Sequence, residues 1–195
     1  MPNLCRIATL IALSALPAAA EATGPLKLAE LSARLYDAGM ATGDPVIIAT
    51  AARLRKEAGL PDEAAPGWQD MLSAAETLAA DDADLLGVIG DIRAETSKGV
   101  ASGPIYHLAA LDAGAADTRP AMAFRGGEYA EAYVEAASGT DLNLTVLDAA
   151  GNVVCTDLNT SHIAYCGWTP ATDGDFVLVI RNAGTVPADY ALMTN

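Results

Sequence analysis

The spacing of apolar residues changes near residue 102, and this change constrains the fold of the 195-residue chain more than any other feature. Before it, apolar side chains recur at helical spacing. After it, they alternate with polar side chains, which is the repeat of a half-buried strand. Helices that precede strands without interleaving are typical of an α+β chain. We therefore predict a small helical domain over residues 24–99 and an antiparallel β-sandwich over residues 102–195.

The first part of the chain has the start and stop signals of about four helices. Asp44 is a natural N-cap, and Pro45 suits the first position of the helix that follows. The helix before it is expected to stop at Gly39, and two further helices are expected at about residues 67–79 and 82–96. Two helical hairpins are too few for a solenoid, which usually needs three or more repeats. The pattern predicts a small bundle packed on the next domain.

The second part alternates clearly in the stretches AYVEAA, DLNLTVLD and DFVLVIR. Glycine-containing turn signals separate these stretches at short intervals, and no helical pattern lies between them. Seven or eight short strands are therefore expected, arranged as an antiparallel sandwich. Residues 98–104, rich in Gly, Ser and Pro, read as the linker between the two domains.

The first residues, MPNLCRIATLIALSALPAAA, have the pattern of a secretory signal peptide. Arg6 precedes an apolar run that is too short to span a bilayer, and Ala18 and Ala20 provide an A-x-A cleavage site. We predict a signal peptide over residues 1–20 and a periplasmic or secreted protein, with no membrane insertion after cleavage.

Acidic side chains dominate the charge. Of 11 basic residues cleavage removes Arg6, and it removes none of the 25 acidic ones, so the expected mature charge is 10 − 25 = −15. A chain this acidic repels phosphate backbones and anionic headgroups. Nucleic acid and membrane surfaces are therefore not expected as partners.

Two cysteines remain after cleavage, because Cys5 leaves with the signal peptide. In an oxidising compartment Cys155 and Cys166 are expected to form a disulfide that stabilises the fold by about 3 kcal/mol. A metal pair or a redox centre are the alternatives, and both usually need closer Cys spacing or more nearby His.

A hairpin loop over residues 148–152 would place Thr145 opposite Cys155 and Asn143 opposite Asp157. A second hairpin would then place Cys155 opposite Cys166 on neighbouring strands of one sheet. One face would carry Leu144, Val146, Val154, Ile163 and Tyr165, and the other Asn143, Cys155, Asp157, Cys166 and Trp168. Which face is buried stays open.

No catalytic residue is predicted. The chain has no G-x-S-x-G and no H-E-x-x-H, and its two histidines, His107 and His162, fall in or beside predicted strands. We expect no bound cofactor, and a weakly bound calcium ion is the alternative. Its candidate ligands are acidic and amide side chains of the turns and edge strands, namely Asp141, Asn143, Asp148, Asn152 and Asp157. The same residue types are ordinary in turns and at sheet edges.

Five short motifs of the second part occur in the order found in the bacterial pre-peptidase C-terminal (PPC) domain family, which this part resembles. They are the D-L-N-L of residues 141–144, Asp148 with Gly151-Asn152, the W-T-P of residues 168–170, Asn182 with Gly184, and the closing YALMTN of residues 190–195. The resemblance implies a β-sandwich module that usually follows a secreted catalytic domain, often a peptidase. No such catalytic domain is recognisable ahead of this module.

These observations favour a non-enzymatic periplasmic or secreted binding protein whose partner is a protein or a glycan. A structural component of an envelope complex and a hydrolase with an unrecognised site are the alternatives. A hydrolase would be expected to lose activity when His107 or His162 is changed.

Overall fold

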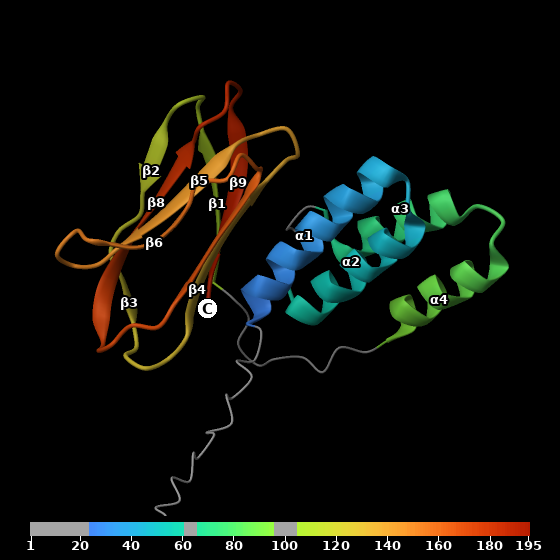
Figure 1. The fold of residues 1–195 in the computed structure, drawn as a ribbon, viewed down its shortest axis with the longest axis horizontal. Helices are drawn as coiled ribbons and strands as arrows, with labels where there is room; N and C mark the ends of the chain where they lie inside the picture. Colours follow the sequence, from blue (N-terminus) through green and yellow to red (C-terminus); the bar gives the residue numbers. More distant parts are fainter. Residues whose placement is uncertain (1–23, 61–65, 96–104) are drawn as a thin grey trace, which may run out of the picture.

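The computed structural model describes residues 24–60, 66–95 and 105–195 (Figure 1). The predicted signal peptide over residues 1–20 and the predicted linker over residues 98–104 lie outside the described residues. Within them, four helices are followed by two antiparallel sheets, so the predicted α+β class is confirmed. No helix of the described ranges is both long enough and apolar enough to cross a membrane.

The helices are α1 (Pro25–Thr42), α2 (Pro45–Ala58), α3 (Trp68–Ala79) and α4 (Ala83–Ala94). Asp44 caps α2 as predicted, because its carboxylate accepts hydrogen bonds from the backbone N–H groups of Val46 and Ile47 at 2.9 and 3.2 Å. Asp82 caps α4 in the same way, by accepting a bond from Leu85 N at 3.0 Å.

The predicted stop of the first helix at Gly39 is wrong. Helix α1 continues to Thr42 and ends at Gly43, whose φ of 64° lies in the left-handed region that glycine adopts freely. A Cβ at Gly39 would lie 2.6 Å from Ile48 Cγ1 of α2. The glycine therefore serves the close packing of two helices and does not end one.

Residues 105–195 form nine strands, or eight if β2 and β3, which pair with successive parts of β8, are counted as one interrupted strand. Their bounds are β1 (Ile105–Leu111), β2 (Ala116–Thr118), β3 (Met122–Phe124), β4 (Ala130–Ala136), β5 (Leu142–Leu147), β6 (Val153–Asp157), β7 (Ile163–Trp168), β8 (Gly174–Asn182) and β9 (Ala188–Thr194). One sheet has the order β1-β9-β4-β7 and the other β2-β8-β5-β6, with β3 also on β8.

The main core lies between the two sheets and includes Trp168, which is buried. Its ring meets Phe124 edge to face at a centroid distance of 4.9 Å and lies 5.6 Å from Phe176. Aromatic pairs of this geometry add to the stabilisation that burial alone provides.

The predicted pairing of β5 and β6 is wrong by one residue. Val146 lies opposite Cys155 and Leu144 opposite Asp157, because the register shifts between Val146 and Leu147. This irregularity leaves one extra residue on β6, and a shift of one residue turns every following side chain to the other face. As a result Cys155 faces the core, while Val154 faces solvent.

The two predicted faces are mixed in the structure, because of this irregularity in β6 and because β7 belongs to the other sheet. Leu144, Val146, Cys155, Cys166 and Trp168 all belong to the core between the sheets, whereas Ile163 and Tyr165 face outward beneath the helices. Strands β6 and β7 belong to different sheets, so the predicted three-stranded register does not form.

The helices pack on the outer face of the sheet β1-β9-β4-β7. Figure 1 shows α1 beside the sandwich and α4 farthest from it. Leu26, Ala29 and Ala33 of α1 form one buried cluster with side chains of three strands, namely Tyr133, Ile163, Ala191 and Met193. A second cluster joins the helices to one another and includes Ile48, Met71, Leu72 and Ile89. The predicted contact between the bundle and the sandwich is therefore present.

Candidate functional site

Strand β4 has polar side chains on the face that the helices cover. Glu131, Tyr133 and Glu135 alternate along the strand and point toward the helices, and all three are buried. A buried carboxylate is costly unless charged or hydrogen-bonding partners compensate it. Each of the two glutamates has such partners on the helices.

Glu135 forms a two-pronged ion pair with Arg55 of α2. Arg55 Nη1 and Nη2 donate to the two Glu135 oxygens at 2.6 and 2.8 Å, and the side chains are only 2% and 3% exposed. Arg55 Nε also donates to Ser32 Oγ at 3.3 Å. Burial lowers the pKa of Arg55, but the hydrogen bonds and the charge of Glu135 together raise it above its ordinary value. Arg55 is therefore held in its charged form.

Glu131 accepts hydrogen bonds from the first turn of α1. Its Oε1 accepts from Lys27 N at 3.0 Å and from Tyr165 Oη at 2.9 Å, and its Oε2 accepts from Leu26 N at 3.5 Å. The free N–H groups and the dipole of a helix N-terminus favour a carboxylate there. A Cβ on Gly24 would lie 2.0 Å from Glu131 Oε2, so a larger residue at this position would displace the Glu131 carboxylate.

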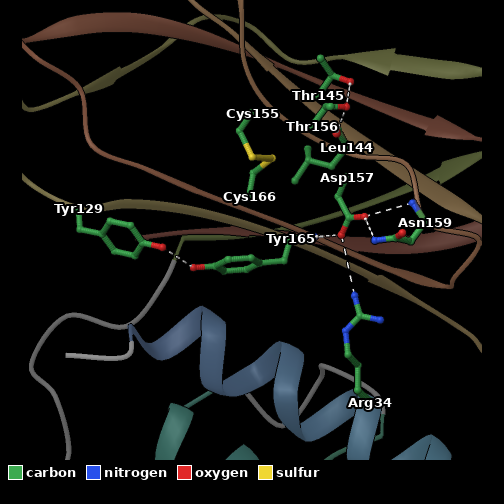
Figure 2. Close-up of a disulfide and its surroundings, with 10 residues drawn as sticks. All are labelled: Arg34, Tyr129, Leu144, Thr145, Cys155, Thr156, Asp157, Asn159, Tyr165 and Cys166. Carbon is green, nitrogen blue, oxygen red and sulfur yellow. Dashed lines mark hydrogen bonds and ion pairs between the residues drawn. A yellow bond between two sulfur atoms is a disulfide. The ribbon is translucent and has the colours of Figure 1, made fainter. Parts of the chain in front are cut away.

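Further charged contacts hold α1 at the edge of the sheet. Arg34 of α1 reaches toward Asp157, with Nη2 3.9 Å from Oδ2 (Figure 2). The same carboxylate oxygen accepts a bond from Tyr165 N of β7 at 3.0 Å. The Nζ of Lys27 lies 4.6 Å from the centroid of the Tyr165 ring. The helices are thus fixed to the sandwich by polar as well as apolar contacts.

Two hollows meet where the helices stop covering the sheet. One, of about 410 Å³, lies between the helices and the ends of β4 and β7, and the other, of about 610 Å³, lies over β1, β9 and β4. Both are lined by residues 135–137, so we treat them as one junction groove. Its helical end includes Tyr36, Asp37, Asp70 and His162, and its sheet end includes Leu108, Ala110, Asp189 and Ala191.

The sheet end of the groove lies where the helices do not cover the sheet, and its side chains are small. Leu108 of β1, Ala191 of β9 and Glu135 of β4 are neighbours across the strands. Ala191 leaves a hollow between the two larger side chains, and Leu108 is 62% exposed. The sheet end of the groove is therefore concave and lined mostly by apolar side chains, as binding sites usually are.

The charges that line the groove are acidic once the buried ion pair is set aside. Asp37 and Asp70 belong to its helical end and Asp189 to its sheet end. Burial, followed by the nearby charges of Asp70 and Asp37, raises the pKa of Tyr36. The Nδ1 of His162 lies 3.5 Å from Asp37 Oδ2.

Among the predicted site residues, the cysteines form the disulfide. Cys155 and Cys166 are bonded with a Cα–Cα distance of 5.8 Å (Figure 2). The bond joins β6 of one sheet to β7 of the other, so it links the two layers of the sandwich. The predicted pairing of the cysteines is present, but its location between neighbouring strands of one sheet is wrong.

The five calcium candidates do not come together. Asp148 and Asn152 hydrogen-bond to each other in the β5–β6 turn, with Asn152 Nδ2 2.9 Å from Asp148 Oδ2. Asp157 lies opposite Leu144, on the face of β5 away from Asn143. Asp141, just before β5, shares the face of Asn143 because the two are separated by one residue. Within the described ranges, no group of three or more His, Cys, Asp or Glu side chains could hold a metal ion.

The two histidines differ in position. His107 lies in the middle of β1, whereas His162 lines the junction groove together with Asp37 and Ser138. A Ser-His-Asp arrangement for nucleophilic catalysis needs a hydrogen bond between serine and histidine. Ser138 and His162 are both among the described residues, and no hydrogen bond joins them. The set therefore lacks the contact that would activate the serine.

Comparison with known proteins finds similar solved structures only. No family model matches the chain, and no curated protein matches it. The PPC domain of a collagenase from Bacillus anthracis is 12% identical with a TM-score of 0.38, covering 47% of this chain and 89% of that one. PliG, a periplasmic inhibitor of g-type lysozyme from Aeromonas hydrophila, is 9% identical with a TM-score of 0.36, covering 52% and 90%.

A third similar structure is the mitogen derived from Yersinia pseudotuberculosis. It is 13% identical with a TM-score of 0.35, and the likeness covers 48% of this chain and 85% of that one. The PPC family remains a resemblance of sequence motifs, and the interpretation of the groove rests on its own residues.

Proposed function

We propose that this protein is a non-enzymatic interaction module of the periplasm or the extracellular space, and that it binds a protein partner in the junction groove. One observation carries the proposal. An open hollow of about 610 Å³ over β1 and β9 has the 62% exposed Leu108 at its margin. Binding sites are usually concave and mostly apolar, with a few polar groups that give specificity.

The proposed location is supported by the disulfide and by the signal-peptide pattern of residues 1–20. Disulfides persist in oxidising compartments and are rare in the cytosol. The bond between Cys155 and Cys166 also joins the two layers of the sandwich, which suits a module that must keep its shape outside the cell.

The charged groups of the groove support binding more than chemistry. Arg55 and Glu135 neutralise each other and are almost fully buried, so neither is placed to act on a substrate. Their role is to fix the helices to the sheet, which gives the groove its walls. A preformed groove of this kind reduces the entropy that binding must overcome.

Site-specific photocrosslinking tests the proposal. A benzoylphenylalanine placed at Leu108 reports on the groove, and one placed at Val153, which is 61% exposed on β6 of the other sheet, is the matched control. We expect position 108 to crosslink a discrete protein in cells and position 153 not to. Replacing Ala110 of β1, an exposed residue that lines the same hollow, with Trp should remove the crosslink. Equal crosslinking from both positions, or an unchanged crosslink in the filled variant, would contradict the proposal.

A hydrolase is the second candidate, favoured by one observation: Ser138, His162 and Asp37 line the same hollow. On binding of a substrate, the serine would have to approach the histidine for catalysis to occur. A panel of ester and peptide substrates tests this idea with the Ser138→Ala and His162→Ala variants. If the unchanged protein hydrolyses a substrate and both variants lose that activity, the hydrolase replaces the binding proposal. If no substrate is turned over, the hydrolase hypothesis is rejected.

The third possibility is a structural part of an envelope complex. It differs from free binding in the lifetime of the association. If the crosslinked partner co-purifies with the chain through size-exclusion chromatography without crosslinking, the structural role is favoured. If the partner is recovered only after crosslinking, the protein is a reversible binder.

A further inference from the structure

The junction groove carries negative charge at both ends. At the helical end lie Asp37 and Asp70, and at the sheet end lies the exposed Asp189. Of the cations that line the groove, Arg55 is committed to Glu135. His162 is a partial counter-charge for Asp37 only when it is protonated. A bound partner would therefore meet carboxylates at each end and alanine side chains between them.

We infer that the groove binds an extended cationic segment of a partner protein, in which an apolar residue is followed by basic residues. This inference rests on the proposed function and names the chemistry of the partner. The apolar residue would lie against Leu108 and Ala191, and one basic residue beside Asp189. A second basic residue would lie at the helical end, between the aspartates and the face of Tyr36, where a cation can also interact with the ring.

The spacing of the strands sets the length of this segment. From β1, which carries Leu108, to β7, beside His162, the sheet order β1-β9-β4-β7 spans three inter-strand steps. At about 4.8 Å per step the distance is about 14 Å, and an extended chain covers it in about four residues. The expected pattern is an apolar residue, a basic residue directly after it, and a second basic residue about four positions after the apolar residue. A small cation or a single sugar would not reach both ends.

The charge of the whole protein favours the same class of partner. With a net charge of −14 at pH 7, the chain attracts cationic segments from a distance and accelerates their association. This attraction is not specific for the groove. A test must therefore separate the groove carboxylates from carboxylates elsewhere.

Fluorescence anisotropy with three labelled peptides provides the test. The probe contains Leu-Lys-Ser-Ser-Lys, an acidic control contains Leu-Glu-Ser-Ser-Glu, and a control without the apolar residue contains Ser-Lys-Ser-Ser-Lys. Each is titrated with the full chain purified from an oxidising compartment. We expect the probe to bind more tightly than either control, and its binding to weaken as salt rises from 50 to 300 mM, because salt screens exposed charges.

Two groove variants and one matched control locate the site. Asp189→Asn and Asp37→Asn each remove one charge from the groove, and Asp175→Asn removes one from an exposed position of β8 on the other sheet. Each groove variant should weaken binding of the probe by about two- to fivefold, the worth of an exposed ion pair. The control should leave it unchanged. Circular dichroism checks that each variant keeps its fold.

The outcomes separate the two proposals. Equal binding of the basic and acidic peptides, or equal effects of the groove and control variants, would overturn the cationic assignment. If filling the hollow with Ala110→Trp still removes the crosslink from position 108 in that case, protein binding in the groove stands. No detectable binding of the basic probe would also overturn the cationic assignment, whatever the crosslinking shows.

Discussion

Replacing Glu135 with Gln should strongly destabilise the protein, because it leaves the buried charge of Arg55 without its counter-charge. The two side chains are 2% and 3% exposed and share two hydrogen bonds of 2.6 and 2.8 Å. Removing one partner of a buried ion pair typically costs about 3–5 kcal/mol. In a domain of this size 1 kcal/mol shifts the melting temperature by about 2–4 °C, so a decrease of about 6–20 °C is expected.

Glu95→Gln is the matched control for this prediction. It removes the same chemical group from the Arg53–Glu95 pair, whose side chains are 61% and 44% exposed. Exposed pairs contribute about 0–1 kcal/mol, so this variant should unfold close to the unchanged protein. Urea unfolding followed by circular dichroism measures both. If Glu135→Gln costs no more than Glu95→Gln, the reasoning about the buried pair is refuted.

A double variant tests the same pair from the other side. Replacing Arg55 with Met and Glu135 with Leu removes both charges and keeps apolar volume. Such exchanges of buried ion pairs are often neutral or stabilising. The double variant should therefore recover most of the stability that Glu135→Gln loses. If the double variant is less stable than Glu135→Gln, the stability lost by Glu135→Gln is not caused by the unpaired charge of Arg55.

Three other predictions concern the disulfide, the helix cap and a lowered pKa. Replacing Cys155 with Ser should lower stability by about 3 kcal/mol without changing the secondary structure, which circular dichroism and urea unfolding check. Two free thiols in the native unchanged protein would contradict the disulfide. Gly24→Val should displace the Glu131 carboxylate and destabilise the contact between α1 and the sandwich, seen as faster hydrogen exchange in α1 but not in β5. Tyr190→Phe removes the hydrogen bond of 2.5 Å that contributes most to lowering the pKa of Asp117. Because a lowered carboxyl pKa stabilises the fold above the ordinary value of about 3.9, this variant should be less stable at pH 7, and the difference should shrink below about pH 4.

The order of helices and strands could be predicted because it depends on local patterns. The Asp44-Pro45 start signal and the alternation of the strands act over a few residues, and both predictions are confirmed. The prediction that the first helix ends at Gly39 was wrong because glycine is needed there for helix packing and not for helix termination. Its missing Cβ lets Ile48 of the next helix come close, which only the packed structure reveals.

The pairing of β5 and β6 could not be predicted from alternation alone. One extra residue near Val154 reverses the faces of β6, and no glycine or proline lies within that strand to indicate the irregularity. The location of the disulfide was predicted wrongly for a different reason: β6 and β7 belong to different sheets, so the bond crosses the core between them.

The junction groove was not predicted from the sequence, although the strand that forms part of it carries an unusual row of polar side chains. Glu131, Tyr133 and Glu135 occupy alternate positions of β4, which normally indicates a face exposed to solvent. The structure buries them because their partners come from helices about 80–105 residues earlier in the chain. Long-range pairs of this kind cannot be deduced from a single sequence. Arg55 in particular reads as one of several basic residues near a helix end, where such residues are common.

Hydrogen exchange with the partner recovered by crosslinking tests the central claim most directly. If the junction groove is the binding site, amide exchange should slow at the β1 and β9 residues beside Leu108 and at the α1 residues beside Asp37. Exchange in β6 and β8 of the other sheet should stay unchanged. Protection confined to β6 and β8, with no change beside the groove, would contradict the account.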